Sequence, residues 1–121
     1  DQMAVSEQLH LELNNFYKVR STLWNDCALA DSIQIKDQQL VTYKNQLEVR
    51  YEIKDEMLVR YQNGVGTNLD IKAIEIKETL EEKGSEISVL FEWKSDPIQW
   101  NFFNRANNAE RVNQFFNERN G

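Results

Sequence analysis

The apolar residues in the first part of the chain recur at helical spacing. They are separated by steps of four and three with one seven-residue gap, and they are Val5, Leu9, Leu13, Phe16, Leu23 and Cys27. This spacing places them on one face of an α-helix, so residues 1–31 are predicted to form a long amphipathic helix that packs on a core. No clear helix-start signal precedes these residues, which we call the apolar stripe. We therefore expect the helix to continue upstream of Asp1 in the native protein.

From residue 32 to residue 103 the apolar positions alternate with polar ones, which is typical of half-buried β-strands. The clearest pattern spans 47–61, where two alternating runs flank a turn near Asp55 and predict a β-hairpin. Residues 62–68 are rich in Gly and Asn and predict a loop, and residues 77–84 predict either a helical turn or a charged hairpin tip. Further strands are predicted at 32–36, 39–43, 69–76, 86–93 and 98–102.

The connections between these predicted strands are short. Short connections favour antiparallel pairing, because parallel strands need long crossovers. Residues 107–119 return to helical spacing and predict a short C-terminal helix. The predicted fold is a single α+β domain over residues 1–121, in which the long N-terminal helix packs on an antiparallel sheet of about four to six strands.

The charge of the chain limits the partners that it can bind. The sequence holds 14 Lys and Arg against 20 Asp and Glu, a net charge of −6. The acids are spread evenly, since residues 1–60 and 61–121 each hold ten acidic and seven basic residues. This surface disfavours nucleic acids and anionic lipids. No run reaches the roughly 18 apolar residues of a membrane span, so we expect membrane attachment only through a segment absent from this sequence.

The chemically active residues do not form a familiar catalytic arrangement. The one cysteine, Cys27, lies on the apolar stripe, and the one histidine, His10, lies about five helical turns away, too far to activate the thiol. Neighbouring carboxylates such as Glu81 and Glu82 fall at predicted turns, where solvated acids are expected. We therefore predict that the protein is not an enzyme and needs no cofactor.

Metal binding is also predicted to be absent, with one alternative left open. A single His and a single Cys cannot make the usual zinc sites. The predicted loop from Asn63 to Asp70 offers oxygen ligands for calcium, although it lacks the acid spacing of a helix–loop–helix calcium site. The other interpretation of this segment is a hairpin loop built from Gly and Asn.

Aromatic residues gather late in the chain. Trp93, Trp100, Phe102 and Phe103 lie within eleven residues of one another. Such residues are usually part of the core, but a group of this kind can also form an exposed patch for a partner. Trp93 and Trp100 are therefore candidate partner-binding residues.

The end of the predicted helix resembles that of minor pilins of type IV pili and minor pseudopilins of type II secretion systems. In that family a hydrophobic residue is followed by an acid, an alanine and a further apolar residue where the long helix closes. Leu23, Asp26, Ala30 and Ile33 occupy these positions in this sequence.

The predicted hairpin resembles the same family. In that family, the first strand of the hairpin carries a tyrosine and the second strand carries a Leu-x-Arg motif. Tyr51, Leu58 and Arg60 occupy these positions in this sequence. The two resemblances together cover residues 16–61, about half of the chain.

The resemblance implies a non-enzymatic subunit that assembles with other pilin or pseudopilin subunits. An upstream segment would anchor the native protein in the inner membrane, and the globular part would face the periplasm or the cell exterior. The helix face that carries Glu12 and Arg20 would contact neighbouring subunits. The alternative is a small cystatin-like or NTF2-like binding module, in which a curved sheet encloses an apolar pocket lined by Trp93, Trp100 and Tyr51.

Overall fold

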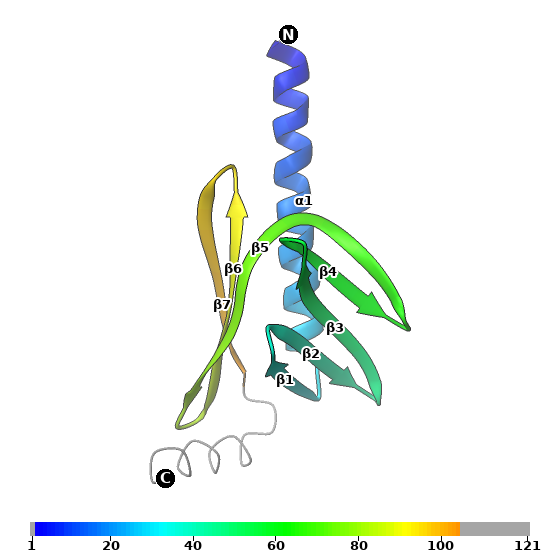
Figure 1. Ribbon diagram of the computed structural model, residues 1–121, viewed down its shortest axis with the longest axis vertical. Helices are drawn as coiled ribbons and strands as arrows, with labels where there is room; N and C mark the ends of the chain where they lie inside the picture. The colour runs from blue at the N-terminus through cyan, green and yellow to red at the C-terminus, as the bar shows by residue number, and fades with distance from the viewer. Residues whose placement is uncertain (1, 105–121) are drawn as a thin grey trace.

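The computed structural model describes residues 2–104, with side chains described from Ser6 onward. One helix, α1 (Gln2–Ala28), is followed by seven strands that pair in chain order as one antiparallel sheet. The strands are β1 (Ser32–Lys36), β2 (Gln39–Lys44), β3 (Leu47–Lys54), β4 (Met57–Gln62), β5 (Val65–Glu81), β6 (Gly84–Trp93) and β7 (Asp96–Asn104). Figure 1 shows this meander beside the helix. The C-terminal helix predicted over 107–119 lies outside the described residues.

The predicted α+β fold, a long helix packed on about four to six strands, is wrong. The described part of the chain is mostly β, with a single helix of 27 residues and one sheet of seven strands. The short strands β1 and β2 belong to the same sheet as the long ones. Residues 65–68 and 77–81, for which a loop and a helical turn or hairpin tip were expected, are both part of β5. Residues 65–68 are all exposed, so no apolar alternation marks them as strand.

The hairpin predicted over 47–61 is confirmed. β3 and β4 pair in antiparallel register, with Tyr51 opposite Arg60. The two turn residues, Asp55 and Glu56, have positive φ angles of 52° and 69°. Two consecutive positive-φ residues give a turn whose twist matches that of the flanking strands, which keeps the hairpin tight. The same geometry recurs at Asp37–Gln38, Asn45–Gln46, Asn63–Gly64 and Lys94–Ser95.

One of these turns offers a test of the local backbone energetics. Gln46 has a φ of 69°, a conformation that costs a residue with a Cβ roughly 1 kcal/mol. The Gln46→Gly variant is therefore expected to raise the free energy of unfolding by about 0.5–1 kcal/mol in a urea titration. Gln34→Gly, in the extended middle of β1, is the matched control and should lower it. Equal effects of both substitutions would contradict this explanation.

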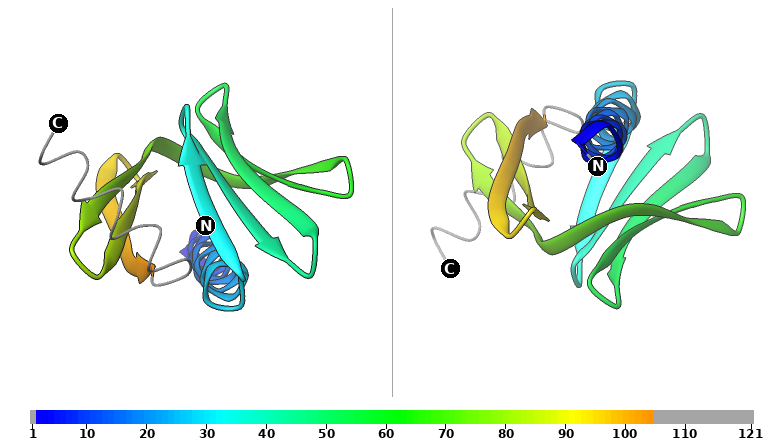
Figure 2. Two further views of the ribbon diagram at one scale, coloured as in Figure 1. Left: turned by 90° about the horizontal axis from the view of Figure 1, so that it is seen from below. Right: turned by 90° about the horizontal axis from the view of Figure 1, so that it is seen from above.

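The long strand β5 joins two halves of the sheet. Its first residues pair with β4 and its later residues pair with β6. The register shifts between Asn68 and Lys72 on the β4 side and between Ala73 and Glu75 on the β6 side, and Asp70 has a φ of 57°. Such bulges bend and twist a strand. The part formed by β1–β4 and the part formed by β6–β7 consequently diverge, and α1 lies in the angle between them (Figure 2).

The core lies between this angled sheet and the second half of α1. The helix contributes Val19, Leu23 and Cys27, which are buried and recur at every fourth residue. Val19 fills the seven-residue gap in the predicted stripe. The sheet contributes buried apolar residues from every strand: Ile33, Leu40, Tyr51, Leu58, Ile71, Ala73, Ile76, Ile87, Val89, Phe91 and Phe102.

The first half of α1 extends past most of the sheet. Leu9, which the apolar spacing predicts to face the core, is 44% exposed, and Leu11 is 62% exposed. Figure 1 shows the reason, since the N-terminal end of α1 stands clear of the strands. Within residues 2–104, no helix has both the length and the apolar character needed to cross a membrane. The helix is thus buried against the sheet along its second half and projects with most of its first half, from which Glu12 still reaches Lys94 in the turn between β6 and β7.

Candidate functional site

The last turns of α1 are tied to the sheet by a polar cluster of Asp26, Tyr51 and Arg60, which we call the anchor cluster. The Asp26 carboxylate accepts a hydrogen bond from the Tyr51 hydroxyl. It also accepts two from the Arg60 guanidinium, with Nε to Oδ2 at 2.9 Å and Nη2 to Oδ1 at 3.2 Å. Tyr51 and Arg60 are register partners on β3 and β4, so both side chains reach the same point of the helix.

The anchor cluster is largely removed from solvent. Tyr51 is fully buried, and the side chains of Asp26 and Arg60 are 16% and 21% exposed. Burial, reinforced by the bond to Asp26, raises the pKa of the Tyr51 hydroxyl, which therefore stays protonated and keeps donating. The hydrogen bonds to Asp26 likewise raise the pKa of Arg60. Charge-assisted bonds in such a setting are stronger than those of an exposed ion pair.

Cys27 lies next to the anchor cluster in the core. The prediction that it is a buried residue is confirmed. Burial, with a smaller contribution from the charge of Asp26, raises the pKa of the thiol well above its ordinary value. Because the thiolate is the reactive form, the role of Cys27 in this position is packing.

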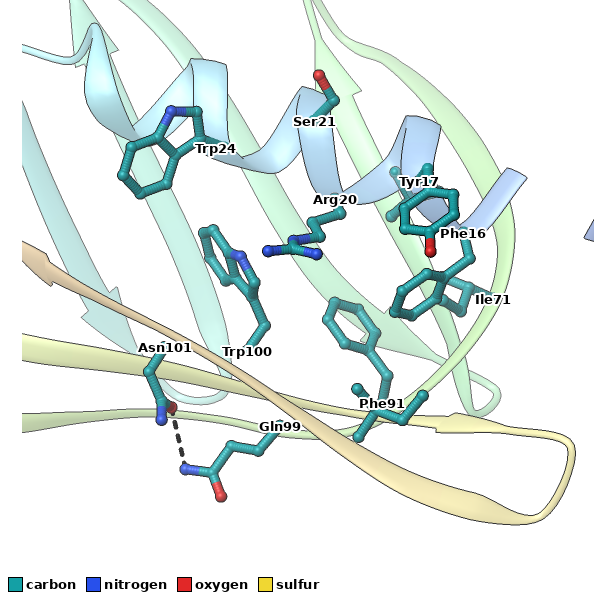
Figure 3. Close-up of a pocket in the computed structure, with 12 residues that line it drawn as sticks. Phe16, Tyr17, Arg20, Ser21, Trp24, Ile71, Phe91, Gln99, Trp100 and Asn101 are labelled. Carbon is teal, nitrogen blue, oxygen red and sulfur yellow. Dashed lines mark hydrogen bonds between the residues drawn. The ribbon is translucent and has the colours of Figure 1, made fainter. Parts of the chain in front are cut away.

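A groove lies between the anchored half of α1 and β7, and we call it the α1–β7 groove. It has a volume of about 880 Å³. Figure 3 shows Trp24 and Arg20 on the helix and Trp100 on β7 facing this space. The lining residues are Phe16, Tyr17, Val19, Arg20, Ser21, Trp24, Ile71, Phe91, Ile98, Gln99, Trp100 and Asn101. Mostly apolar walls with a few polar groups are typical of binding sites.

Three aromatic rings meet at one end of the groove. Trp24 lies edge-on to both Trp100 and Phe102, with ring centroids 6.4 Å apart in each pair. Trp100 and Phe102 are neighbours on β7, with centroids 4.8 Å apart. Phe102 is buried, whereas Trp24 is 51% exposed. The rings therefore join the helix to the last strand and still leave aromatic surface open to a partner.

Arg20 is the one charged residue in the lining of the groove. Within the part of the chain that the structure describes, ion pairs are formed by Arg50, Arg60 and Lys94, and Arg20 takes part in none of them. Its guanidinium extends from the helix toward Trp100 (Figure 3). Arg20 is exposed, and an exposed guanidinium without a carboxylate partner among the described residues is available to a negatively charged group.

The four residues predicted to bind partners fall into two pairs. Arg20 and Trp100 both line the α1–β7 groove. Glu12 and Trp93 line a second groove of about 680 Å³ farther along the helix. There Glu12 is already paired with Lys94, with Nζ to Oε2 at 2.8 Å, and this bond lowers the pKa of Glu12. The lining of the second groove also contains Asp70, Lys72 and Glu92. Charges of both signs therefore lie in the second groove, whereas the α1–β7 groove contains a cation and no carboxylate.

The pocket expected for a binding module is not formed by the described residues. Tyr51 is fully buried and bonded to Asp26. Trp93 and Trp100 line different grooves, and Tyr51 lines neither. The structure thus brings Trp100 together with Arg20 rather than with Trp93 and Tyr51.

The segment considered for calcium is mostly strand. A turn at Asn63 and Gly64 leads directly into β5. The Oδ1 atom of Asn68 accepts a hydrogen bond from the backbone amide of Asp70 at 2.8 Å, which supports the bulge there. Among the described residues, no group of three or more His, Cys, Asp or Glu side chains is placed to hold a metal ion.

Sequence reasoning missed Trp24 and Tyr17 as residues of the groove. Neither residue belongs to the predicted apolar stripe or to the aromatic group at 93–103. A signal was nevertheless present, because Tyr17, Arg20 and Trp24 follow one another in steps of three and four and so share a face beside the buried stripe. Large aromatic residues on such a second face indicate a contact surface.

Comparisons of this chain with protein-family models, with curated proteins and with solved structures find no match. The function is therefore inferred from the geometry of α1, the anchor cluster and the α1–β7 groove, together with the family resemblance of residues 16–61.

Proposed function

We propose that this protein is a non-enzymatic minor subunit of a type IV pilus-like filament or a type II secretion pseudopilus, and that it acts by assembling with other subunits. The observation that carries the proposal is the division of α1 into two halves. The second half is anchored to the sheet, and the first half projects with leucines exposed to solvent. A projecting helix with exposed apolar residues gains stability when it packs on other helices.

The anchor cluster suits this role mechanically. A helix that transmits contacts from a filament to a globular domain must be held rigidly at the domain. Asp26 on the helix is bonded to Tyr51 and Arg60, which are 25 and 34 positions away in sequence. A connection across two paired strands resists both sliding and rotation of the helix.

The family resemblance of residues 16–61 also supports the proposal. The resemblance was drawn from an acid at the end of the helix and from a tyrosine and an arginine in the hairpin. These residues, Asp26, Tyr51 and Arg60, form one hydrogen-bonded unit in the structure. Their shared position gives a physical reason for that combination of residues to occur together.

The proposal places the globular part outside the cytoplasm. In the assembled state, an N-terminal membrane anchor would hold the subunit in the inner membrane. The sheet would face the periplasm or the cell surface. The acidic net charge of −6 fits contact with proteins rather than with anionic lipid or nucleic acid.

The experiment that tests the proposal compares two leucines of equal exposure. Leu11 on the projecting half of α1 is 62% exposed, and Leu47 on β3 is 63% exposed. The full-length native protein, carrying Leu11→Lys or Leu47→Lys, is expressed in its own organism in place of the wild type. Filaments are then sheared from the cells or purified from the envelope, and the subunit is quantified by immunoblot.

We expect Leu11→Lys to lower the amount of subunit in the filament fraction by about tenfold, because a lysine would be desolvated in the helix contact. Leu47→Lys should leave it unchanged. Both variants should keep the thermal midpoint of the wild type, since both side chains are exposed. Absence of the wild-type protein from filament and envelope assemblies, or an equal response to the two substitutions, would overturn the proposal.

A further inference from the structure

We infer that the α1–β7 groove binds an amphipathic helix of a neighbouring subunit, and that a carboxylate in the apolar stripe of this helix pairs with Arg20. The inference rests on the proposed function and adds to it the location of one subunit contact and the chemistry of the partner.

The helix surface that forms one wall of the groove continues beyond it. Leu9, Leu13, Tyr17, Arg20 and Trp24 follow one another in steps of four, four, three and four. Leu9, Tyr17 and Trp24 are 44%, 53% and 51% exposed. Steps of three and four produce the ridges by which one helix packs against another. These five residues therefore form a continuous surface that runs from the projecting half of α1 into the groove, with the spacing that helix–helix packing requires.

The shape of this surface favours a helix over a small molecule. A small ligand would fill the space between Trp24, Trp100 and Phe91 but would leave Leu9, which is 44% exposed, in water. A helix that runs alongside α1 would cover this leucine and then enter the groove. β7 supplies the second wall, through Ile98 to Asn101. A helix in an apolar groove is a common mode of recognition between proteins.

The charge of the groove specifies what the incoming helix must carry. Its lining contains Arg20 and no carboxylate. Covering an unpaired guanidinium with apolar side chains would leave a desolvated charge, which is costly. In the second groove, Lys94 is already paired with Glu12 at 2.8 Å. The second groove also holds the carboxylates of Asp70 and Glu92, whereas the α1–β7 groove holds none. A partner of the α1–β7 groove would therefore supply the negative charge itself, from an Asp or Glu in the apolar stripe of its helix.

The test uses photocrosslinking in assembled filaments. Ser21 lines the groove and is exposed, so a Ser21→p-benzoylphenylalanine variant places the photoreactive group at the proposed contact. Glu48, exposed on β3, carries the same group in the matched control. The full-length variants are expressed in the native organism, the filaments are irradiated, and crosslinked peptides are identified by mass spectrometry.

The expected result is a crosslink from position 21, absent from position 48, to a helical segment of another subunit that contains an Asp or Glu. A crosslink to residues 105–121 of the same chain would show that the chain fills its own groove and would overturn the inference. So would a subunit that enters filaments but gives no crosslink from position 21. Both of these results leave the proposed function standing, whereas absence of the subunit from filaments removes the function and the inference together.

Charge variants test the role assigned to Arg20. Arg20→Glu is expected to lower the crosslink yield from position 21 by about tenfold, because it would place two negative charges in contact. Arg20→Lys keeps the positive charge and should retain most of the yield. An unchanged yield in Arg20→Glu, with the thermal midpoint of the wild type, would show that the partner carries no carboxylate at this point.

Discussion

Replacement of Arg60 by alanine is expected to lower the free energy of unfolding by about 3 kcal/mol, because it leaves the Asp26 carboxylate largely buried without its main partner. In the native protein Arg60 donates two hydrogen bonds to Asp26, at 2.9 and 3.2 Å. The Tyr51 hydroxyl remains as a donor but cannot neutralise the charge. Urea titration followed by tryptophan fluorescence measures this loss directly.

Arg50 provides the control for this prediction. It lies on the adjacent strand, stacks on the exposed side of the sheet against the ring of Tyr61 at 4.6 Å, and its side chain is 38% exposed. Arg50→Ala should therefore cost about 1 kcal/mol or less. If the two arginine variants were equally stable, Asp26 and Arg60 would not form the anchor of the helix.

The second large effect is expected for Leu23→Ala, with a loss of about 3 kcal/mol in the free energy of unfolding. Leu23 is 1% exposed and lies between Val19 and Cys27 on the buried face of α1. Removing its side chain leaves a cavity where the helix meets the sheet. Cys27 supplies a second readout, because weaker docking of the helix should speed the reaction of this buried thiol with a disulfide reagent at neutral pH.

Leu11→Ala is the matched control on the same helix. Leu11 lies on the projecting half and is 62% exposed, so its truncation should change the stability by no more than about 0.5 kcal/mol. A large loss from Leu11→Ala, or a small one from Leu23→Ala, would contradict the division of α1 into an anchored half and a projecting half.

The sequence predicted which face of a helix or strand is buried better than it predicted where each element and its contacts end. Helical spacing correctly assigned Leu23 and Cys27 to the buried face, and strict alternation correctly located the hairpin of β3 and β4. It failed for Leu9, because spacing shows which way a residue faces but not where the opposing sheet ends. The length of β5 was missed for a related reason, since a strand exposed on both faces carries no apolar alternation.

The candidate site was predictable in part. Arg20 and Trp100 were both chosen from the sequence, but nothing in it showed that they share a groove while Trp93 and Glu12 lie in another. That arrangement depends on the bend of β5, which turns β6 and β7 toward the helix. Bulges of this kind depend on local backbone geometry, such as the positive φ of Asp70, that residue patterns do not report.

The meander has a consequence for how the molecule acquires its structure. Every strand pairs with its neighbour in the chain, and five of the turns hold two positive-φ residues, so each hairpin closes with little loop entropy. Docking of α1 is different, since the Asn15 amide donates to the Leu69 carbonyl across 54 positions. The sheet can thus form by local steps, whereas docking of the helix needs long-range contacts, and we expect docking to follow formation of the sheet. Until the helix docks, the apolar face of the sheet stays uncovered, and the interval before docking is when the chain is most open to aggregation.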